Sequence, residues 1–293
     1  MDSKDFQLLA ALYDDARQSY KSLGRLISLS APAARDRLKR LEAQGILQGF
    51  MLTLDPNVFH RDELVLFFHD KEFTRREVAN ALAAPDVAWI GWKLDGGITV
   101  GIWPKDRAQA IDEITAVLST KPTGQAFTRE HRMLVRRLSL IDLTLIDALI
   151  DQPRIPMNEL IEYTGLSPKT VRKHLERLVE TETIFIEPRL GALRDSGVLV
   201  YQIAVTGRVS VGDVRSIMGE AVLIHHLHDP PIKYLLCRGS DLSDVTTKTR
   251  GLRELPGVEA ANISLNKEIL ISTDFEHSLI HEEIRNLEKI KAV

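Results

Sequence analysis

The chain has 293 residues, of which 44% are hydrophobic and 27% are charged, and its formal net charge is −3 with a pI near 6.3. This is the composition of an ordinary globular protein with about two to four compact modules. The slightly acidic balance excludes a histone-like, charge-driven coat for nucleic acid, although a local basic surface is compatible with it. The one cysteine, Cys237, excludes an internal disulfide bond and a zinc site built from several cysteines.

The N-terminal residues MDSKDFQLL do not have the pattern of a signal peptide. No apolar run approaches the roughly 18 residues that a membrane-spanning helix needs. We therefore expect a cytoplasmic protein.

Three helices are predicted at the start of the chain, over residues 3–15, 20–27 and 31–44. Gly45 follows the third helix, at a position typical of a helix end. A β-rich segment, residues 46–54, then leads to the turn signal Asp55-Pro56-Asn57. Three helices and a short hairpin make a winged helix-turn-helix, which we assign to residues 1–57.

A sheet domain is predicted next, over residues 58–137. Strands are expected at residues 64–68, 87–94, 98–103 and 126–131, and helices at 74–83 and 106–118. Thr74 with Glu77 three residues later forms a capping box, and Asp95-Gly96-Gly97 is a hairpin turn signal. The order βαββαβ is that of a ferredoxin-like domain.

The sequence pattern of the N-terminal region recurs 137 positions later without a gap. Asp5–Leu12 resembles Asp142–Leu149, and the same offset aligns Leu23 with Leu160, Ser30 with Ser167 and Arg35 with Arg172. Such a match over nearly forty residues indicates an internal duplication. It predicts helices at residues 140–151, 157–163 and 168–181 and a strand at 183–190, which form a second winged helix-turn-helix over residues 138–193.

The rest of the second half also follows the first. Strands are predicted at residues 198–205, 222–227, 234–237 and 258–265, with helices at 211–218 and 242–255. A further strand at 268–272 and a helix at 277–291 have no counterpart in the first half. Residues 194–293 are therefore expected to be a second ferredoxin-like domain with a C-terminal helix. The predicted fold class is α+β, with two repeats of a winged helix-turn-helix and a ferredoxin-like, RAM-like domain.

The segment Met157–Thr181 has the pattern of a helix-turn-helix. Ser167 is placed to cap the second helix and Pro168 to begin it. Val171, Leu175 and Leu178 recur at spacings of four and three, which defines one apolar face. The opposite face carries Lys169, Thr170, Arg172, Lys173 and Arg177. A surface hairpin with a solvated cationic face remains the alternative.

A winged helix-turn-helix followed by βαββαβ resembles the Lrp/AsnC family of feast/famine regulators. The resemblance rests on the opening helix Asp142–Leu149, on the turn and second helix within Leu160–Leu178, and on Glu254–Val258 before the last ferredoxin-like strand. Family members usually carry one such unit per chain and dimerise, whereas this chain carries two. The resemblance implies an intramolecular pseudo-dimer, or a homodimer or higher oligomer that forms through the β-sheets.

The resemblance implies a sequence-specific transcriptional regulator that binds double-stranded DNA. The second repeat begins its basic helix with polar residues, whereas the first has Ala31-Pro32-Ala33 and places Asp36 where the second has Lys173. We therefore expect the second repeat to contribute more base readout. The predicted DNA-contacting residues are Ser167, Lys169, Thr170, Arg172, Lys173 and Arg177, with Ser30, Ala33, Arg35, Arg37 and Arg40 in the first repeat.

The family resemblance also implies that a small molecule such as an amino acid could act as effector. No residue string identifies a ligand, and a plain hairpin and a helix cap explain the glycine turns equally well. The residues considered for such a site are Gly96, Gly239, Asp241, His226 and His228.

An enzyme is the alternative, because some proteins of similar architecture decarboxylate sirohaem, sometimes as fused pairs. Strand alternation puts His226 and His228 on one face, with His225 opposite. Two histidines at this spacing without a third ligand are weak support for a metal site. The chain lacks a glycine-rich phosphate loop, a G-x-S-x-G elbow and an H-E-x-x-H motif. We therefore expect no catalytic residues, no cofactor and no metal.

Overall fold

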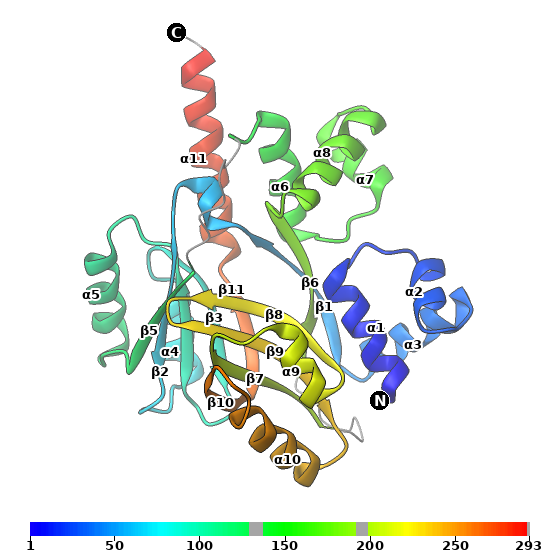
Figure 1. The fold of residues 1–293 in the computed structure, drawn as a ribbon. Coiled ribbons are helices and arrows are strands. Elements are labelled where there is room, and N and C mark those ends of the chain that lie inside the picture. The colour runs from blue at the N-terminus through cyan, green and yellow to red at the C-terminus, as the bar shows by residue number, and fades with distance from the viewer. Residues whose placement is uncertain (129–136, 192–198, 292–293) are drawn as a thin grey trace.

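The computed structural model describes residues 1–128, 137–191 and 199–291. It contains two helical modules and two sheet domains, in the α+β arrangement expected from the repeat (Figure 1). None of the helices in these ranges is long and apolar enough to cross a membrane.

The first helical module consists of α1 (Ser3–Asp14), α2 (Tyr20–Leu26) and α3 (Ala31–Ala43), followed by β1 (Leu47–Leu54) and a 3-10 turn at Pro56–Phe59. The second consists of α6 (Leu140–Asp151), α7 (Met157–Thr164) and α8 (Pro168–Glu180), followed by β6 (Ile184–Leu190). The predicted helices are thus confirmed to within one residue at their ends. The first module buries one apolar stripe from each helix in a core of its own. The apolar stripes of the second module are buried in a larger core, which also contains residues of β1 and of the C-terminal segment.

The prediction that each winged module contains a β-hairpin is wrong. Each module supplies a single strand, and β1 pairs antiparallel with β6 of the other half from Leu47 opposite Leu190 to Leu54 opposite Ile184. A single strand leaves its backbone N–H and C=O groups unpaired, and the equivalent strand of the other repeat pairs with them. This two-stranded ribbon connects the two helical modules (Figure 1).

The first sheet domain is ferredoxin-like, as predicted. It comprises β2 (Glu63–Phe68), α4 (Arg75–Leu82), β3 (Val87–Lys93), β4 (Ile98–Ile102), α5 (Arg107–Leu118) and β5 (Gly124–Thr128), with strand order β3-β4-β2-β5. The last predicted strand, 126–131, is confirmed as far as residue 128, and the remainder lies outside the described residues.

The second sheet domain comprises β7 (Leu199–Gly207), α9 (Val211–Met218), β8 (Ala221–His228), β9 (Pro231–Gly239), α10 (Leu242–Arg253) and β10 (Val258–Ser264), with strand order β10-β7-β9-β8. The C-terminal segment then crosses to the other half. β11 (Asn266–Ile271) pairs antiparallel with β3 of the first sheet, and α11 (Thr273–Lys291) packs against α6 (Figure 1).

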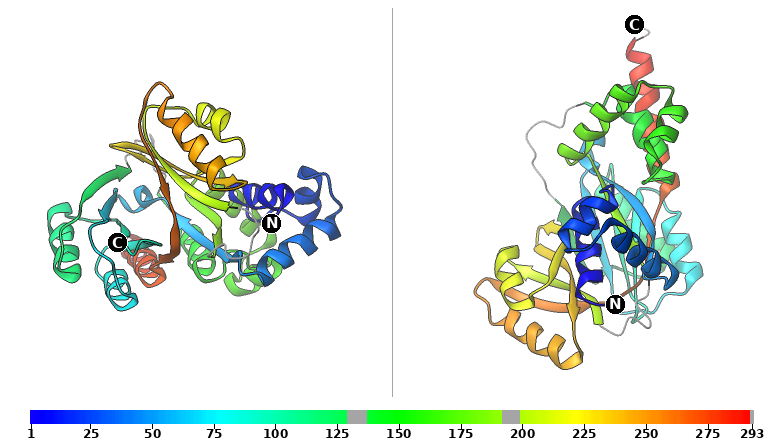
Figure 2. Two further views of the ribbon diagram at one scale, coloured as in Figure 1. Left: turned by 90° about the horizontal axis from the view of Figure 1, so that it is seen from below. Right: turned by 90° about the vertical axis from the view of Figure 1, so that its right-hand side faces the viewer.

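Three strand pairings among the described residues join the two repeats into one pseudo-dimer. They are the β1–β6 ribbon, the crossing of β11 onto β3, and a β-bridge between Phe127 and Asp229 that connects the edges of the two sheets. Both helical modules lie on the same side of the molecule, to the right in Figure 1, and the second sheet domain lies below them in the right-hand view of Figure 2. The intramolecular pairing expected from a fused repeat is therefore what the structure contains.

The turns of the two helix-turn-helix motifs differ at one residue. Gly165 ends α7 with a φ of 64°, and the residue at the same position of the first repeat is Ser28, with a φ of 56°. Glycine adopts this left-handed conformation without steric cost, whereas serine does not. We expect Ser28→Gly to raise the free energy of unfolding by about 0.5–1 kcal/mol, and Gly165→Ser to lower it by a similar amount. Urea denaturation measures both, and a shift of both variants in the same direction would contradict the assignment.

Candidate nucleic-acid interface

Helix α8 is held in place by its buried face and by its cap. Val171, Leu175 and Leu178 are buried in the core of the second helical module. The hydroxyl of Ser167 accepts a hydrogen bond from the backbone N–H of Thr170 at 3.1 Å, which satisfies one of the free donors at the helix start. The Ser167 side chain therefore serves the helix itself, while its exposed position leaves the helix start open to an approaching phosphate.

The outward face of α8 carries three exposed cations, Lys169, Arg172 and Lys173. Within the described part of the chain, no ion pair joins any of them to a carboxylate. Their charges are free to meet phosphates or base edges, and the structure thus leaves the predicted basic surface of the second repeat intact.

Arg177 turns the other way, toward the buried carboxylate of Asp142 at the start of α6. The ring of His174 approaches the same oxygen, with Nδ1 2.8 Å from Oδ1 of Asp142. Burial alone would raise the pKa of Asp142, but hydrogen bonds from Ser139 and His174 and the charge of Arg177 outweigh it and hold that pKa below its usual value. Arg177 thus fastens α8 to α6, and its contact with DNA stays a prediction.

The first repeat contains the equivalent anchor. Nη1 of Arg37 lies 2.8 Å from Oδ1 of buried Asp5, and Nη2 of Arg40 lies 2.9 Å from Oδ2 of the same residue. Arg37 also reaches Asp2 at 2.7 Å. Two of the three arginines predicted to contact DNA from α3 are therefore paired within the domain, and DNA contact by them stays a prediction.

The outward face of α3 is less basic than that of α8. The guanidinium of Arg35 is 3.5 Å from the neighbouring Asp36, and both side chains are largely exposed. Ser30 caps the helix through Ala33 at 3.3 Å, and Ala33 offers a methyl group only. The asymmetry expected between the repeats is thus larger in the structure, because pairing removes further cations from the first one.

The residues considered for effector binding are spread over separate places. Gly96 lies in the β3–β4 turn with a φ of 86°, and a Cβ atom at Gly239 would be 2.5 Å from the Val245 side chain. Asp241 caps α10. Local structure thus accounts for these three residues. His226 and His228 do share one face of β8, with ring centroids 4.3 Å apart, as the strand alternation predicted.

Two cavities of about 560 and 120 Å³ lie between the repeats. The residues that line both cavities include four polar side chains from different elements, Tyr13 of α1, Glu63 of β2, Glu187 of β6 and His225 of β8. Glu63 accepts a hydrogen bond from the indole of Trp89 at 2.7 Å and is 3.3 Å from Nε2 of His225. Of the predicted ligand residues, His226 borders the larger cavity. The sequence did not reveal this polar interior because its members come from four distant segments.

Burial raises the pKa of Glu187 to about 7. Between the ordinary value of 4.5 and this one the folded state binds more protons than the unfolded chain, so stability falls as pH rises through that window. Burial alone would lower the pKa of His225, but the nearby Glu63 carboxylate outweighs it and raises that pKa. The stability that His225 contributes is therefore also lost as the pH rises. We expect the free energy of unfolding to fall by roughly 1–3 kcal/mol from pH 5 to pH 8.

Glu187→Gln should flatten part of this fall, because the amide is neutral at every pH. The part that comes from Glu276, whose pKa burial raises to about 8, should remain. Glu180→Gln, an exposed change near the end of α8, is the control and should retain the wild-type pH dependence. Urea denaturation across the pH range measures both variants, and a wild-type slope in Glu187→Gln would contradict the assignment.

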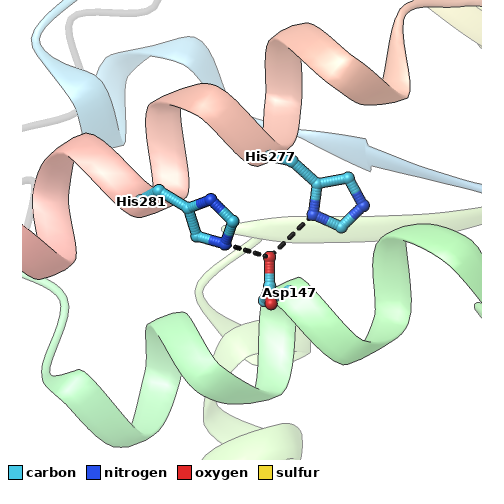
Figure 3. Close-up of side chains that lie close together, drawn as sticks. All are labelled: Asp147, His277 and His281. Carbon is cyan, nitrogen blue, oxygen red and sulfur yellow. Dashed lines mark hydrogen bonds and ion pairs between the residues drawn. The ribbon is translucent and has the colours of Figure 1, made fainter.

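One cluster of side chains was not predicted from the sequence. Asp147 on α6 lies against His277 and His281 on α11, and these three residues could together hold a metal ion (Figure 3). The signal was present as an Asp-x-x-x-Asp spacing at 147 and 151 and a His-x-x-x-His spacing at 277 and 281, each of which places two ligands on one helix face. Only the packing of α11 on α6 shows that these faces meet.

Two family models match the chain at the helical modules. The AsnC-type helix-turn-helix domain matches residues 1–42, and a winged helix-turn-helix DNA-binding model matches residues 138–184. The fold and the basic surface of α8 thus define a winged helix-turn-helix protein, in which the helix-turn-helix domain occurs twice.

Curated relatives share the helix-turn-helix class. The chain is 28% identical over 88 residues to YezC, an uncharacterised HTH-type transcriptional regulator of Bacillus subtilis, which covers 30% of this chain and 63% of that protein. It is 37% identical over 57 residues to the HTH-type transcriptional regulator Rv2324 of Mycobacterium tuberculosis, covering 20% of this chain and 38% of the relative. These matches span less than two thirds of either relative. The two helical modules are thus similar to the helix-turn-helix domains of Lrp/AsnC-type regulators, and this chain carries two of them.

Solved structures resemble the whole chain or half of it. The sirohaem decarboxylase NirDL matches 97% of this chain and 99% of its own, with 12% identity and a TM-score of 0.49. The transcriptional regulator NMB0573 of Neisseria meningitidis, solved with L-Met, matches 48% of this chain and 97% of its own, with 19% identity and a TM-score of 0.32. Similarities this low do not indicate a shared function.

Proposed function

We propose that this protein is a sequence-specific transcriptional regulator that binds double-stranded DNA through α8 and α3. The observation that carries the proposal is the outward face of α8, where Lys169, Arg172 and Lys173 are exposed while Arg177 is turned inward to Asp142. A helix held rigidly by its inner face and basic on its outer face is the form in which a recognition helix enters the major groove.

The two repeats read their half-sites unequally. α8 supplies side chains that can hydrogen-bond to base edges, whereas the start of α3 supplies mainly alanine methyl groups. The preferred site is therefore an imperfect palindrome with half-sites about one helical turn apart. Both helices belong to one chain, so a single molecule can occupy both half-sites.

Modulation by a small metabolite such as an amino acid is part of the proposal. It is supported by the cavities between the repeats, whose walls come from α1 and β6, next to the helical modules, and from both sheets. An occupant would contact both repeats and so favour one arrangement of the two recognition helices over another.

Assembly through the sheets is also proposed. β10 is the outer strand of the four-stranded sheet, and Ile263 on this strand is 46% exposed. An edge strand presents unpaired backbone groups to a second copy of the chain.

Selection of bound sequences from a random DNA pool, with and without amino acids, tests the proposal. We expect one enriched, imperfectly palindromic motif and a steep loss of affinity with salt. Recovery of no motif would contradict a regulator. The decarboxylase alternative is tested separately by adding iron-containing tetrapyrrole and recording its absorption spectrum, which an enzyme of that class would shift and a DNA-binding regulator would not.

A further inference from the structure

Two histidines and one aspartate meet where α11 packs on α6. Nδ1 of His277 lies 2.7 Å, and Nε2 of His281 3.4 Å, from the same carboxylate oxygen of Asp147 (Figure 3). The three ligand atoms lie within 4.8 Å of one another. We propose that Asp147, His277 and His281 form a binding site for a divalent first-row transition-metal ion, for which Zn²⁺ is the probe.

The donor set and its dimensions suit such an ion. Imidazole nitrogen with one carboxylate oxygen is preferred by zinc and its neighbours rather than by Mg²⁺ or Ca²⁺, which take oxygen ligands. Ligands about 2.0–2.1 Å from a tetrahedral Zn²⁺ are about 3.3 Å from each other. The His281–Asp147 separation of 3.4 Å already has this value, and the His277–Asp147 separation of 2.7 Å reaches it after a small ring movement. The fourth position is left to water.

Asp151 supplies the support that a ligating histidine requires. Its Oδ1 lies 3.4 Å from Nε2 of His277, the ring nitrogen that faces away from Asp147. A carboxylate on the second nitrogen fixes the tautomer and orientation of a metal-bound imidazole. Asp147 and Asp151 are one turn apart on α6, as His277 and His281 are on α11, so all four side chains come from two facing helix stripes.

The position of the site determines what a bound ion would do. α6 opens the second helical module, whereas α11 follows β11, which is part of the first sheet. Buried Leu279 and Ile280 of α11 share a core with Leu143 and Ile146 of α6, so the helices are docked before any ion binds. An ion bound only to the docked state would stabilise it by mass action and fasten the second helical module to the first sheet.

Calorimetric titration of the untagged protein with Zn²⁺ tests the site. We expect one ion per chain, at least a tenfold weaker affinity in His281→Ala, and roughly tenfold weaker affinity in Asp151→Asn. His281 is 53% exposed, so its variant should fold normally. His226→Gln, which disrupts the other histidine pair, is the matched control and should bind as the wild type does.

Thermal unfolding gives a second readout that involves no DNA. Zn²⁺ should raise the Tm of the wild type by about 2–6 °C and leave that of His281→Ala unchanged. Equal affinity in the wild type and His281→Ala, or no binding and no Tm shift with Zn²⁺ in large excess, would overturn the site. Failure of the DNA proposal would leave these results unaffected.

Discussion

Arg172→Ala is expected to weaken binding to the selected DNA site by about 1–3 kcal/mol, which is roughly a 5- to 150-fold loss of affinity. The reason is that Arg172 is exposed on the outward face of α8, near the helix start, where a guanidinium can donate two hydrogen bonds to guanine. Lys173→Ala should weaken binding to all sequences and make it less sensitive to salt, because a lysine near phosphates acts mainly through its charge. Mobility-shift titrations at several salt concentrations measure both effects.

The first repeat supplies matched controls. Arg35→Ala should cost less than Arg172→Ala, because Arg35 shares its charge with Asp36. Asp36→Lys introduces the residue that the second repeat has at this position, and it should strengthen binding to a site with two copies of the better half-site. The side chains changed in these four variants, at positions 35, 36, 172 and 173, are all exposed, so the Tm should not change. Equal losses for Arg35→Ala and Arg172→Ala would contradict unequal readout.

The repeat made much of the fold predictable. A 137-residue offset aligned apolar periodicity, caps and turns in two copies, so agreement between them located α1–α3 and α6–α8 closely. Strand pairing between the copies was not predictable in this way. The partner of β1 is β6, 137 residues away, and β11 lies beside β3, because pairing depends on which edges are free after folding rather than on local pattern.

The sequence predicts that one face of α8 is basic, but it does not predict which of its cations form ion pairs within the protein. A helical wheel separates Arg172 from Leu175, yet it cannot distinguish Arg172 from Arg177, since both lie off the apolar stripe. The distinction depends on Asp142, which lies on another helix. The same limit hid the site at Asp147, where each half of the ligand set looks like an ordinary solvated spacing until the helices are packed together.

Asp142→Ala is expected to lower the free energy of unfolding of the second helical module by about 2–4 kcal/mol. Asp142 is almost fully buried and joins the Ser139 cap, His174 and Arg177. Without it, the 27% exposed guanidinium of Arg177 reaches water only in part, and the cap of α6 loses its partner. Asp5→Ala in the first repeat should cost less, because Arg37 retains its ion pair with Asp2 and the Arg40 side chain is 50% exposed. Urea denaturation followed by circular dichroism measures both variants.

The pH dependence and the DNA affinity separate this anchor from a DNA contact. The pKa of Asp142 is held low, so its stabilisation is present above the unfolded value near 3.8 and is lost as pH falls through the folded value. The acid transition should therefore shift to higher pH when Arg177→Met removes one partner. Arg177→Met should also lower stability while retaining most of the DNA affinity at a temperature where it is folded, the reverse of Arg172→Ala. If Arg177→Met instead lost affinity at unchanged stability, the guanidinium would have to leave Asp142 for the DNA, and the anchor would be a feature of the free protein alone.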